Sequence, residues 1–204
     1  MMVKLIDIPA GFIASIVTYL EMTERPRPKP GPALVPLQLA PLANPDLDRY
    51  RALFRAIGAP WLWFSRLMLD DDALRDRLTA PGIALYVAQE RGEDVAQKDV
   101  GLLELDFSVE GEVEISFLGL VPRLTGKGAG AWLMQQALAL AWAARPRRVW
   151  LHTCSLDHPR ALPFYLQHGF RAYARKVEVA PDPRLNGLLP PEAAPHVPLI
   201  REAA

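Results

Sequence analysis

The sequence predicts an α/β protein of 204 residues, built on one mixed central sheet with helices on its faces. Strand-like and helix-like segments alternate along the middle of the chain, and 50% of the residues are hydrophobic, which is enough for a substantial core. Seven of the twenty prolines lie between Pro26 and Pro45, and six more lie between Pro181 and Pro198. We therefore expect three parts: an N-terminal strand with a proline-rich arm (1–32), the domain itself (33–180) and an extended proline-rich tail (181–204).

The first 80 or so residues are expected to hold two strands and two helices. Gly11–Leu20 is rich in Ile, Val, Phe and Tyr, which favours a strand, and this strand could add to a sheet edge in this chain or in a neighbouring copy. After a proline-rich linker (Glu24–Pro32), Ala33–Ala40 is expected to form the next strand. The first helix, Asp46–Ile57, ends at a glycine followed by a proline. The second helix, Asp70–Leu78, has acids in its first turn and a Pro-Gly pair beyond its end.

The remaining part is expected to run from three strands into alternating helices and strands. Polar turns that contain glycine, including Glu90–Lys98, separate the three apolar strands. Pro163 lies inside the last expected helix, so we expect that helix to be kinked or to begin late. The expected elements are strands over Ile83–Gln89, Val100–Phe107 and Glu112–Val121, a helix over Gly128–Ala144, a strand over Val149–Thr153, a helix over Pro159–His168 and a strand over Phe170–Val179.

Composition excludes some classes of function. Lys and Arg together number 23, equal to Asp and Glu, so the balanced charge does not indicate nucleic-acid binding. Cys154 is the only cysteine, which excludes an internal disulfide, and the spacing of the four histidines indicates no metal site. No apolar run is long enough to cross a bilayer, and the interrupted N-terminal segment does not fit a signal peptide. We expect a cytoplasmic protein that binds no membrane.

Three glycines at alternate positions, Gly126, Gly128 and Gly130, follow an apolar strand and open a helix. Glycine lets a backbone approach a ligand closely, and a helix start offers unpaired N–H groups with partial positive charge. The segment is therefore expected to cradle a phosphorylated ligand. It is not a P-loop, because the glycine spacing is wrong and Lys127 precedes a glycine rather than Ser or Thr. It is not a dinucleotide fingerprint either, because Ala131 stands where the third glycine is required.

This glycine segment resembles the GCN5-related N-acetyltransferase (GNAT) superfamily, which binds acetyl-CoA in the corresponding turn. The family pattern is Pro, two residues, Gln or Arg, two residues, then Gly-x-Gly or Gly-x-Ala. Pro122, Gly128 and Gly130 fit it, whereas Thr125 occupies the Gln/Arg position and removes one side-chain contact to the pyrophosphate. The backbone N–H groups from Gly126 to Ala131 could still hold the phosphates.

A second segment is similar to the family signature Asn-x-x-Ala-x-x-x-Tyr-x-x-x-Gly-Phe. Ala161, Tyr165, Gly169 and Phe170 match at the right intervals, and His158 stands where Asn is usual. The resemblance extends over roughly residues 33–179. It implies a mostly antiparallel sheet in which the strands Glu112–Val121 and Val149–Thr153 splay apart to admit the pantetheine arm.

The resemblance also implies which residues hold acetyl-CoA. Backbone groups on the first splayed strand would pair with the pantetheine arm, and Gly119 would fit a bulge there. The glycine turn would bind the pyrophosphate, and Arg123, Lys127 and Arg160 could offset its charge. The cofactor-binding residues expected are Leu118, Gly119, Leu120, Thr125, Gly126, Lys127, Gly128, Ala129, Gly130, Ala131, His158 and Arg160.

The reaction implied is direct transfer of an acetyl group from CoA to a primary amine within a ternary complex. Tyr165 is the expected proton donor to the leaving thiolate, with the N–H near Leu120 as oxyanion donor. Glu114 is the expected base, acting through water, and Glu104 and Asp106 are the reserves. Strand alternation would place Glu112, Glu114 and Ser116 on one face.

The acceptor is left open by the sequence. Trp61, Trp63 and Phe64 would shape its pocket or simply pack on the sheet, and His152 is either a core residue or part of that pocket. The acceptor is a small-molecule amine or a protein amine. Two alternatives stay open: a non-catalytic acyl-CoA sensor or interaction module of the same fold, and a structural protein whose proline-rich arm and tail mediate assembly while the fold is incidental. A homodimer stays open as well.

Overall fold

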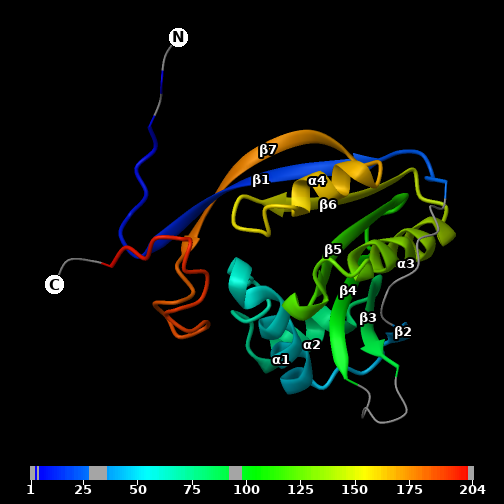
Figure 1. The fold of residues 1–204 in the computed structure, drawn as a ribbon, viewed down its shortest axis with the longest axis horizontal. Helices are drawn as coiled ribbons and strands as arrows, with labels where there is room; N and C mark the ends of the chain where they lie inside the picture. Colours follow the sequence, from blue (N-terminus) through cyan, green and yellow to red (C-terminus); the bar gives the residue numbers. More distant parts are fainter. Residues whose placement is uncertain (1–2, 4, 28–35, 92–97, 202–204) are drawn as a thin grey trace.

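The computed structural model describes residues 3, 5–27, 36–91 and 98–201, and these form a single seven-stranded sheet with helices on both faces (Figure 1). The strand order is β2-β3-β4-β5-β6-β1-β7, and every neighbouring pair is antiparallel except β5 and β6. The predicted mixed, mostly antiparallel sheet is therefore confirmed. The strands are β1 (Phe12–Met22), β2 (Leu37–Pro41), β3 (Ile83–Glu90), β4 (Asp99–Asp106), β5 (Glu112–Leu120), β6 (Arg148–Cys154) and β7 (Arg171–Pro181).

Four α-helices and two short 3₁₀ turns connect the strands. Asp46 and Asp70 cap the first two helices, accepting hydrogen bonds from the N–H groups of Arg49 and Ala73. The last helix begins late, as expected, so that Pro163 lies in its first turn, where its missing N–H leaves no helical bond unmade. The helices are α1 (Leu47–Gly58), α2 (Asp71–Thr79), α3 (Ala129–Ala143) and α4 (Ala161–Gln167), and the 3₁₀ turns are η1 (Ala59–Trp61) and η2 (Pro122–Leu124).

Two buried clusters lie on opposite faces of the sheet. The α3 cluster packs α3 against β4, β5, β6 and the end of β1, with Leu20, Leu133 and Leu151 at its centre. The α1–α2 cluster packs the first two helices against β3 and β4, with Phe54 and Leu74 fully buried. The sheet thus carries a helical layer on each side near β5, which fixes the position of the strand that lines the site.

The strand β1 does not lie at the sheet edge, and the expectation of an edge strand was wrong. It pairs with β6 on one side and with β7 on the other, along nearly its whole length. Ile13, Val17 and Leu20 are all buried, so the strand contributes side chains to both faces of the sheet. The two ladders pair both edges of β1, while the α3 cluster buries Leu20 and the α1–α2 cluster buries Ile13.

The proline-rich tail differs from the extended segment that was expected. Residues 182–201 fold into successive turns, and Leu189 packs into the α1–α2 cluster. The buried Arg184 binds the carboxylate of Asp182 at 2.6 Å and donates to the carbonyls of Ala193, Ala194, Val197 and Pro198. One guanidinium therefore joins four carbonyl groups of the tail, one of which, that of Ala194, also accepts from the Val197 N–H.

Some expectations fall outside the described residues. These are part of the expected linker and strand start (28–35) and most of the expected turn between β3 and β4 (92–97). Within the described part, no helix combines the length and apolar character that a bilayer crossing requires.

Candidate active site

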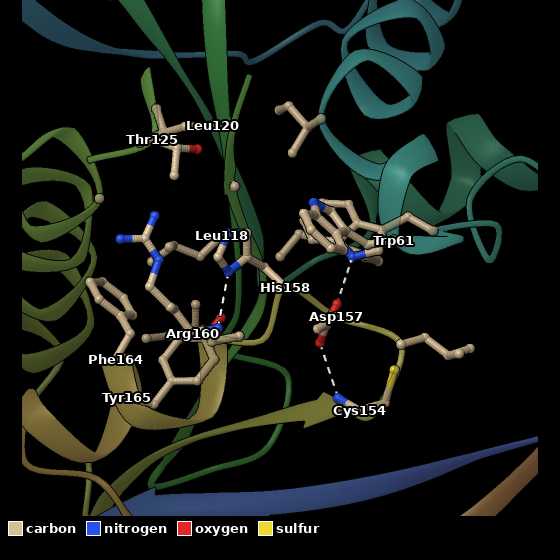
Figure 2. Close-up of a pocket in the computed structure, with 18 of the residues that line it drawn as sticks. Trp61, Leu118, Leu120, Thr125, Cys154, Asp157, His158, Arg160, Phe164 and Tyr165 are labelled. Atoms are coloured by element: carbon tan, nitrogen blue, oxygen red, sulfur yellow. Dashed lines mark hydrogen bonds between the residues drawn. The ribbon is translucent and has the colours of Figure 1, made fainter. Parts of the chain in front are cut away.

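The splayed strands predicted from the sequence are present. β5 and β6 pair in parallel only at Glu112–Arg148, Val113–Val149 and Glu114–Trp150, and beyond Glu114 the two strands separate. A cavity of about 610 Å³ occupies the gap. Its walls come from β5, the glycine turn with the start of α3, β6, the segment that leads into α4, and the connection between α1 and α2 (Figure 2).

The bulge in β5 lies at Ser116 and not at Gly119. Glu104 pairs with Phe117 and Leu105 with Ile115, which leaves Ser116 as the extra residue, whereas Gly119 pairs regularly with Leu102. The expected alternation of Glu112, Glu114 and Ser116 therefore stops at the bulge. The Ser116 hydroxyl lines the cavity, and it is buried without a hydrogen-bond partner in the described structure.

Gly119 has a packing role instead. A Cβ at this position would lie 2.4 Å from Cγ2 of Ile57 and 2.8 Å from the Trp63 ring. Helix α1 and Trp63 thus approach the strand more closely than any side chain would allow. The missing side chain brings the aromatic wall of the cavity onto β5.

We expect Gly119→Ala to destabilise the protein by about 1–3 kcal/mol, because the added methyl must displace Ile57 and Trp63. Urea denaturation followed by far-UV circular dichroism measures this. Gly130→Ala is the matched control: its Cβ would make only ordinary contacts, at 3.7 Å from Phe164, within helix α3. An equal loss in both variants would contradict the close-packing role of Gly119.

The glycine turn forms one end of the cavity. Gly126 and Gly128 have φ values of 81° and 74°, in the left-handed region that favours glycine. Helix α3 begins at Ala129, so the N–H groups of its first turn have no partner within the helix. The residues that line this end of the cavity are Thr125, Gly126, Gly128, Gly130 and Ala131.

Several expected phosphate-binding residues do not line the cavity. Lys127 is exposed, and Ala129, the first residue of α3, is fully buried. Arg123 forms a bidentate ion pair with Glu90, at 2.6 and 2.7 Å. Arg160 and His158 do line the cavity.

His158 and Arg160 lie together at the entrance to α4 (Figure 2). The Nδ1 atom of His158 accepts a hydrogen bond of 3.0 Å from the Arg160 N–H, and the imidazole packs edge-on against Trp61. Burial and the charge of Arg160 lower the pKa of His158, which keeps the imidazole neutral at neutral pH. Among the lining residues, Arg160 is then the side chain with a permanent positive charge.

Tyr165 extends from α4 into the cavity, where Leu118 and Leu120 of β5 form the facing wall. Its ring packs edge-on against Phe164 and Phe170, which fixes its direction. Burial, together with the negative charge of Asp157, raises the pKa of Tyr165 above its ordinary value. The phenol therefore holds its proton at neutral pH, as a proton donor must.

Asp157 is a residue whose importance the sequence did not indicate. One carboxylate oxygen accepts from Trp63 Nε1 at 3.0 Å, and the other accepts from Thr153 Oγ1 at 2.5 Å and from the Cys154 N–H at 3.0 Å. Asp157 thereby ties the end of β6 to the aromatic wall, across 94 positions of sequence. The turn between Cys154 and Asp157 is local, so the sequence could have suggested it. The contact between Asp157 and Trp63 joins distant segments, so the sequence could not.

Aromatic side chains form the opposite side of the cavity. Trp61, Trp63 and Phe64 all line it, together with Phe117 from β5. Phe54, Trp63 and Phe117 pack against one another with ring centroids 5.0–5.5 Å apart. These mutual ring contacts hold the aromatic wall together.

Of the three carboxylates considered as bases, none lines the cavity. Glu104 is fully buried, with Arg66 at 2.5 Å and Arg77 at 3.5 Å, and Asp106 binds Arg77 at 3.0 Å. Glu114 has its Oε1 atom 3.5 Å from Nδ1 of His152, and His152 does line the cavity. Within the described residues, no cluster of His, Cys, Asp or Glu side chains is arranged to hold a metal ion.

Comparisons with known proteins agree with this geometry. A model of the acetyltransferase (GNAT) family matches residues 50–170. No curated protein sequence matches the chain. Many solved structures share its fold, at identities that support an argument about fold alone, and three of them are described next.

A putative GNAT acetyltransferase from Novosphingobium aromaticivorans has a TM-score of 0.55 at 18% identity, over 85% of this chain and 68% of that one. A GCN5-related N-acetyltransferase from Sphaerobacter thermophilus has a TM-score of 0.55 at 19% identity, over 83% and 53%. An aminoglycoside acetyltransferase from an uncultured soil metagenomic sample, in complex with trehalose, has a TM-score of 0.51 at 21% identity, over 65% and 87%.

This chain spans about half of the Sphaerobacter chain, and 63% of a similar chain of unknown function from Staphylococcus epidermidis. The family match, in contrast, runs without interruption from within α1 to the end of α4, and it includes the α1–α2 connection, β5, the glycine turn and β6, which line the cavity. It extends over more than half of the residues. The chain therefore belongs to the acetyltransferase (GNAT) family.

Proposed function

We propose that this protein is an acetyl-CoA-dependent N-acetyltransferase that transfers an acetyl group to a primary amine by direct transfer in a ternary complex. The observation that carries the proposal is a single cavity, lined at once by the glycine turn, the free edge of β5 and Tyr165. A family member with this cavity has the means to hold a phosphorylated thioester and to protonate its leaving group.

The residues present fit acetyl-CoA. Beyond Glu114, the side of β5 that faces β6 lacks a strand partner, so its backbone groups near Leu118–Leu120 are available to the pantetheine amides. Ser116 offers a buried hydroxyl that has no partner among the described residues. A Cβ at Gly126 would meet nothing within 4 Å, so the turn is open where the pyrophosphate would bind.

The chemistry needs two proton movements. Acetyl-CoA supplies the thioester when bound; the new N–C bond forms as the S–C bond breaks. Tyr165 gives its proton to the departing sulfur, and a backbone N–H near Leu120 stabilises the negative charge on the carbonyl oxygen. The amine must also lose a proton to a base on the Glu114–His152 side of the cavity, where Oε1 of Glu114 lies 3.5 Å from Nδ1 of the cavity-lining His152.

The acceptor would enter along the aromatic wall. Trp61, Trp63 and Phe117 suit an amine with an apolar or aromatic body, and Asp157 and Glu178 add negative charge that attracts its ammonium form. The metagenomic structure with this fold is an aminoglycoside acetyltransferase, so an aminoglycoside belongs in the set of amines to test. A protein amine, on a lysine or an N-terminus, belongs there as well.

The test combines calorimetry with CoA and thiol release from acetyl-CoA. The amines are 2-phenylethylamine, spermidine, kanamycin and a lysine-containing peptide. We expect binding of CoA and amine-dependent thiol release. Binding without release for every amine would contradict transfer and favour the non-catalytic sensor, and no binding would overturn the whole proposal.

Arg160→Ala is expected to weaken CoA binding by about tenfold, because a charge-assisted contact to phosphate contributes about 1.5–3 kcal/mol and is partly screened at this exposed position. Isothermal titration calorimetry measures the change. Arg175→Ala, on the exposed strand β7, removes an arginine that does not line the cavity and serves as the control. Equal affinities for the Arg160 variant and the control would show that Arg160 does not contact the phosphates.

A further inference from the structure

We propose that His152 is the group that removes the proton from the acceptor amine, and that Glu114 is a positioning residue that acts through it. This inference rests on the proposed function. The lone pair on Nε2 of His152 takes one proton from the bound ammonium, which frees the lone pair of the amine nitrogen. The neutral amine then attacks the acetyl carbon, and the second proton that this nitrogen loses restores the phenol of Tyr165 after Tyr165 has given its proton to the sulfur. The proton on His152 then leaves to solvent through the exposed side of the imidazole.

The geometry places His152 in the cavity lining, close to the point where β5 and β6 separate. It lies on β6 two residues beyond Trp150, the last residue paired with β5, so it lines the gap where the strands separate. Its Nδ1 atom is 3.5 Å from the Glu114 carboxylate, which leaves Nε2 as the nitrogen free to act. The ring of Tyr19 on β1 lies 5.7 Å away and supports the imidazole from the other side.

The other titratable side chains that line the cavity are occupied or unsuited to accept a proton. Asp157 already accepts three hydrogen bonds, and Glu178 is near the hydroxyl of Ser15. His158 uses Nδ1 to accept from Arg160, and its pKa is lowered. Cys154 is a neutral thiol whose pKa burial raises. Tyr165 must hold a proton, not take one.

The charges around His152 favour its protonated form. Glu114 raises the pKa of His152, burial opposes this, and the carboxylates of Asp157 and Glu178 add to the rise. Tyr19 packs on the ring, and the ammonium group of Lys176 lies on the face of Tyr19, 5.0 Å from its centroid. A base surrounded by three carboxylates gains proton affinity and also attracts a cationic acceptor.

The experiment compares two nucleophiles in the full-length protein. A primary amine from the panel is an ammonium at neutral pH and needs a base, whereas hydroxylamine is already uncharged and does not. We expect His152→Gln to lower thiol release with the amine by about 100-fold, and to leave release with hydroxylamine, above the uncatalysed background, nearly unchanged. Retained hydroxylamine activity also shows that the variant folds and binds acetyl-CoA.

The pH profile tests the role of Glu114. With the wild type, kcat/KM for the amine should rise as His152 loses its proton. Glu114→Gln removes the carboxylate that raises this pKa, so the rise should move to lower pH and the maximal rate should fall. Glu112→Gln, on the same strand but paired with Arg148 outside the cavity, should leave the profile in place.

The outcomes separate this inference from the proposed function. If wild type releases thiol with neither nucleophile, the proposed function fails and the role of His152 falls with it. If wild type is active and His152→Gln loses both reactions equally, or keeps the amine reaction, the assignment of the base is overturned. A profile that Glu114→Gln leaves unmoved would overturn the positioning role.

Discussion

Tyr165→Phe is expected to lower the rate of acetyl transfer by about 10²- to 10⁴-fold, the range that a positioned general acid contributes. The variant keeps the ring that packs on Phe164 and Phe170 and loses only the hydroxyl. CoA affinity should therefore stay the same while kcat falls. Single-turnover thiol release and calorimetry with CoA measure the two quantities separately.

The pH dependence gives a second prediction about the same group. Because burial and Asp157 raise the pKa of Tyr165, the phenol stays protonated throughout the neutral and mildly alkaline range. Wild-type activity should not fall in that range through loss of this proton.

Tyr86→Phe, on β3 and outside the cavity, is the matched control for Tyr165→Phe and should keep full activity. A Tyr165→Phe variant as fast as this control would show that the thiolate is protonated by another donor.

The local elements of the fold could be predicted because short stretches of sequence determine them. Aspartates cap α1 and α2 through N–H groups three residues away, and the glycines of the turn occur where a positive φ is needed. The late start of α4 follows from Pro163 in the same way. Both family motifs are local as well, so the sequence indicated the cavity's glycine turn and its tyrosine.

What escaped prediction depends on contacts between distant segments. The bulge at Ser116 exists because of how β5 pairs with β4, and Gly119 is needed because Ile57 and Trp63 lie against it. Asp157 looks like an ordinary turn residue until Trp63 is brought to it. The position of β1 shows the same limit, because its own sequence favours a strand without specifying its partners.

The interior position of β1 leads to the largest expected effect on stability. Leu20 lies on β1, is 0% exposed and packs in the α3 cluster. Leu20→Ala should lower the free energy of unfolding by about 2–5 kcal/mol, because it removes buried methyl groups and leaves a cavity. Urea denaturation, followed by tryptophan fluorescence, measures the loss.

Ile16→Ala is the matched control, because Ile16 lies on the same strand but is 45% exposed and belongs to neither buried cluster. If the Leu20 side chain did not pack in the α3 cluster, the two substitutions would cost similar, small amounts, and that result would contradict the burial of this face of β1. The strand also joins β6, which holds His152, to β7, which holds Glu178. The stability of β1 therefore supports the acceptor side of the cavity as well as the α3 cluster.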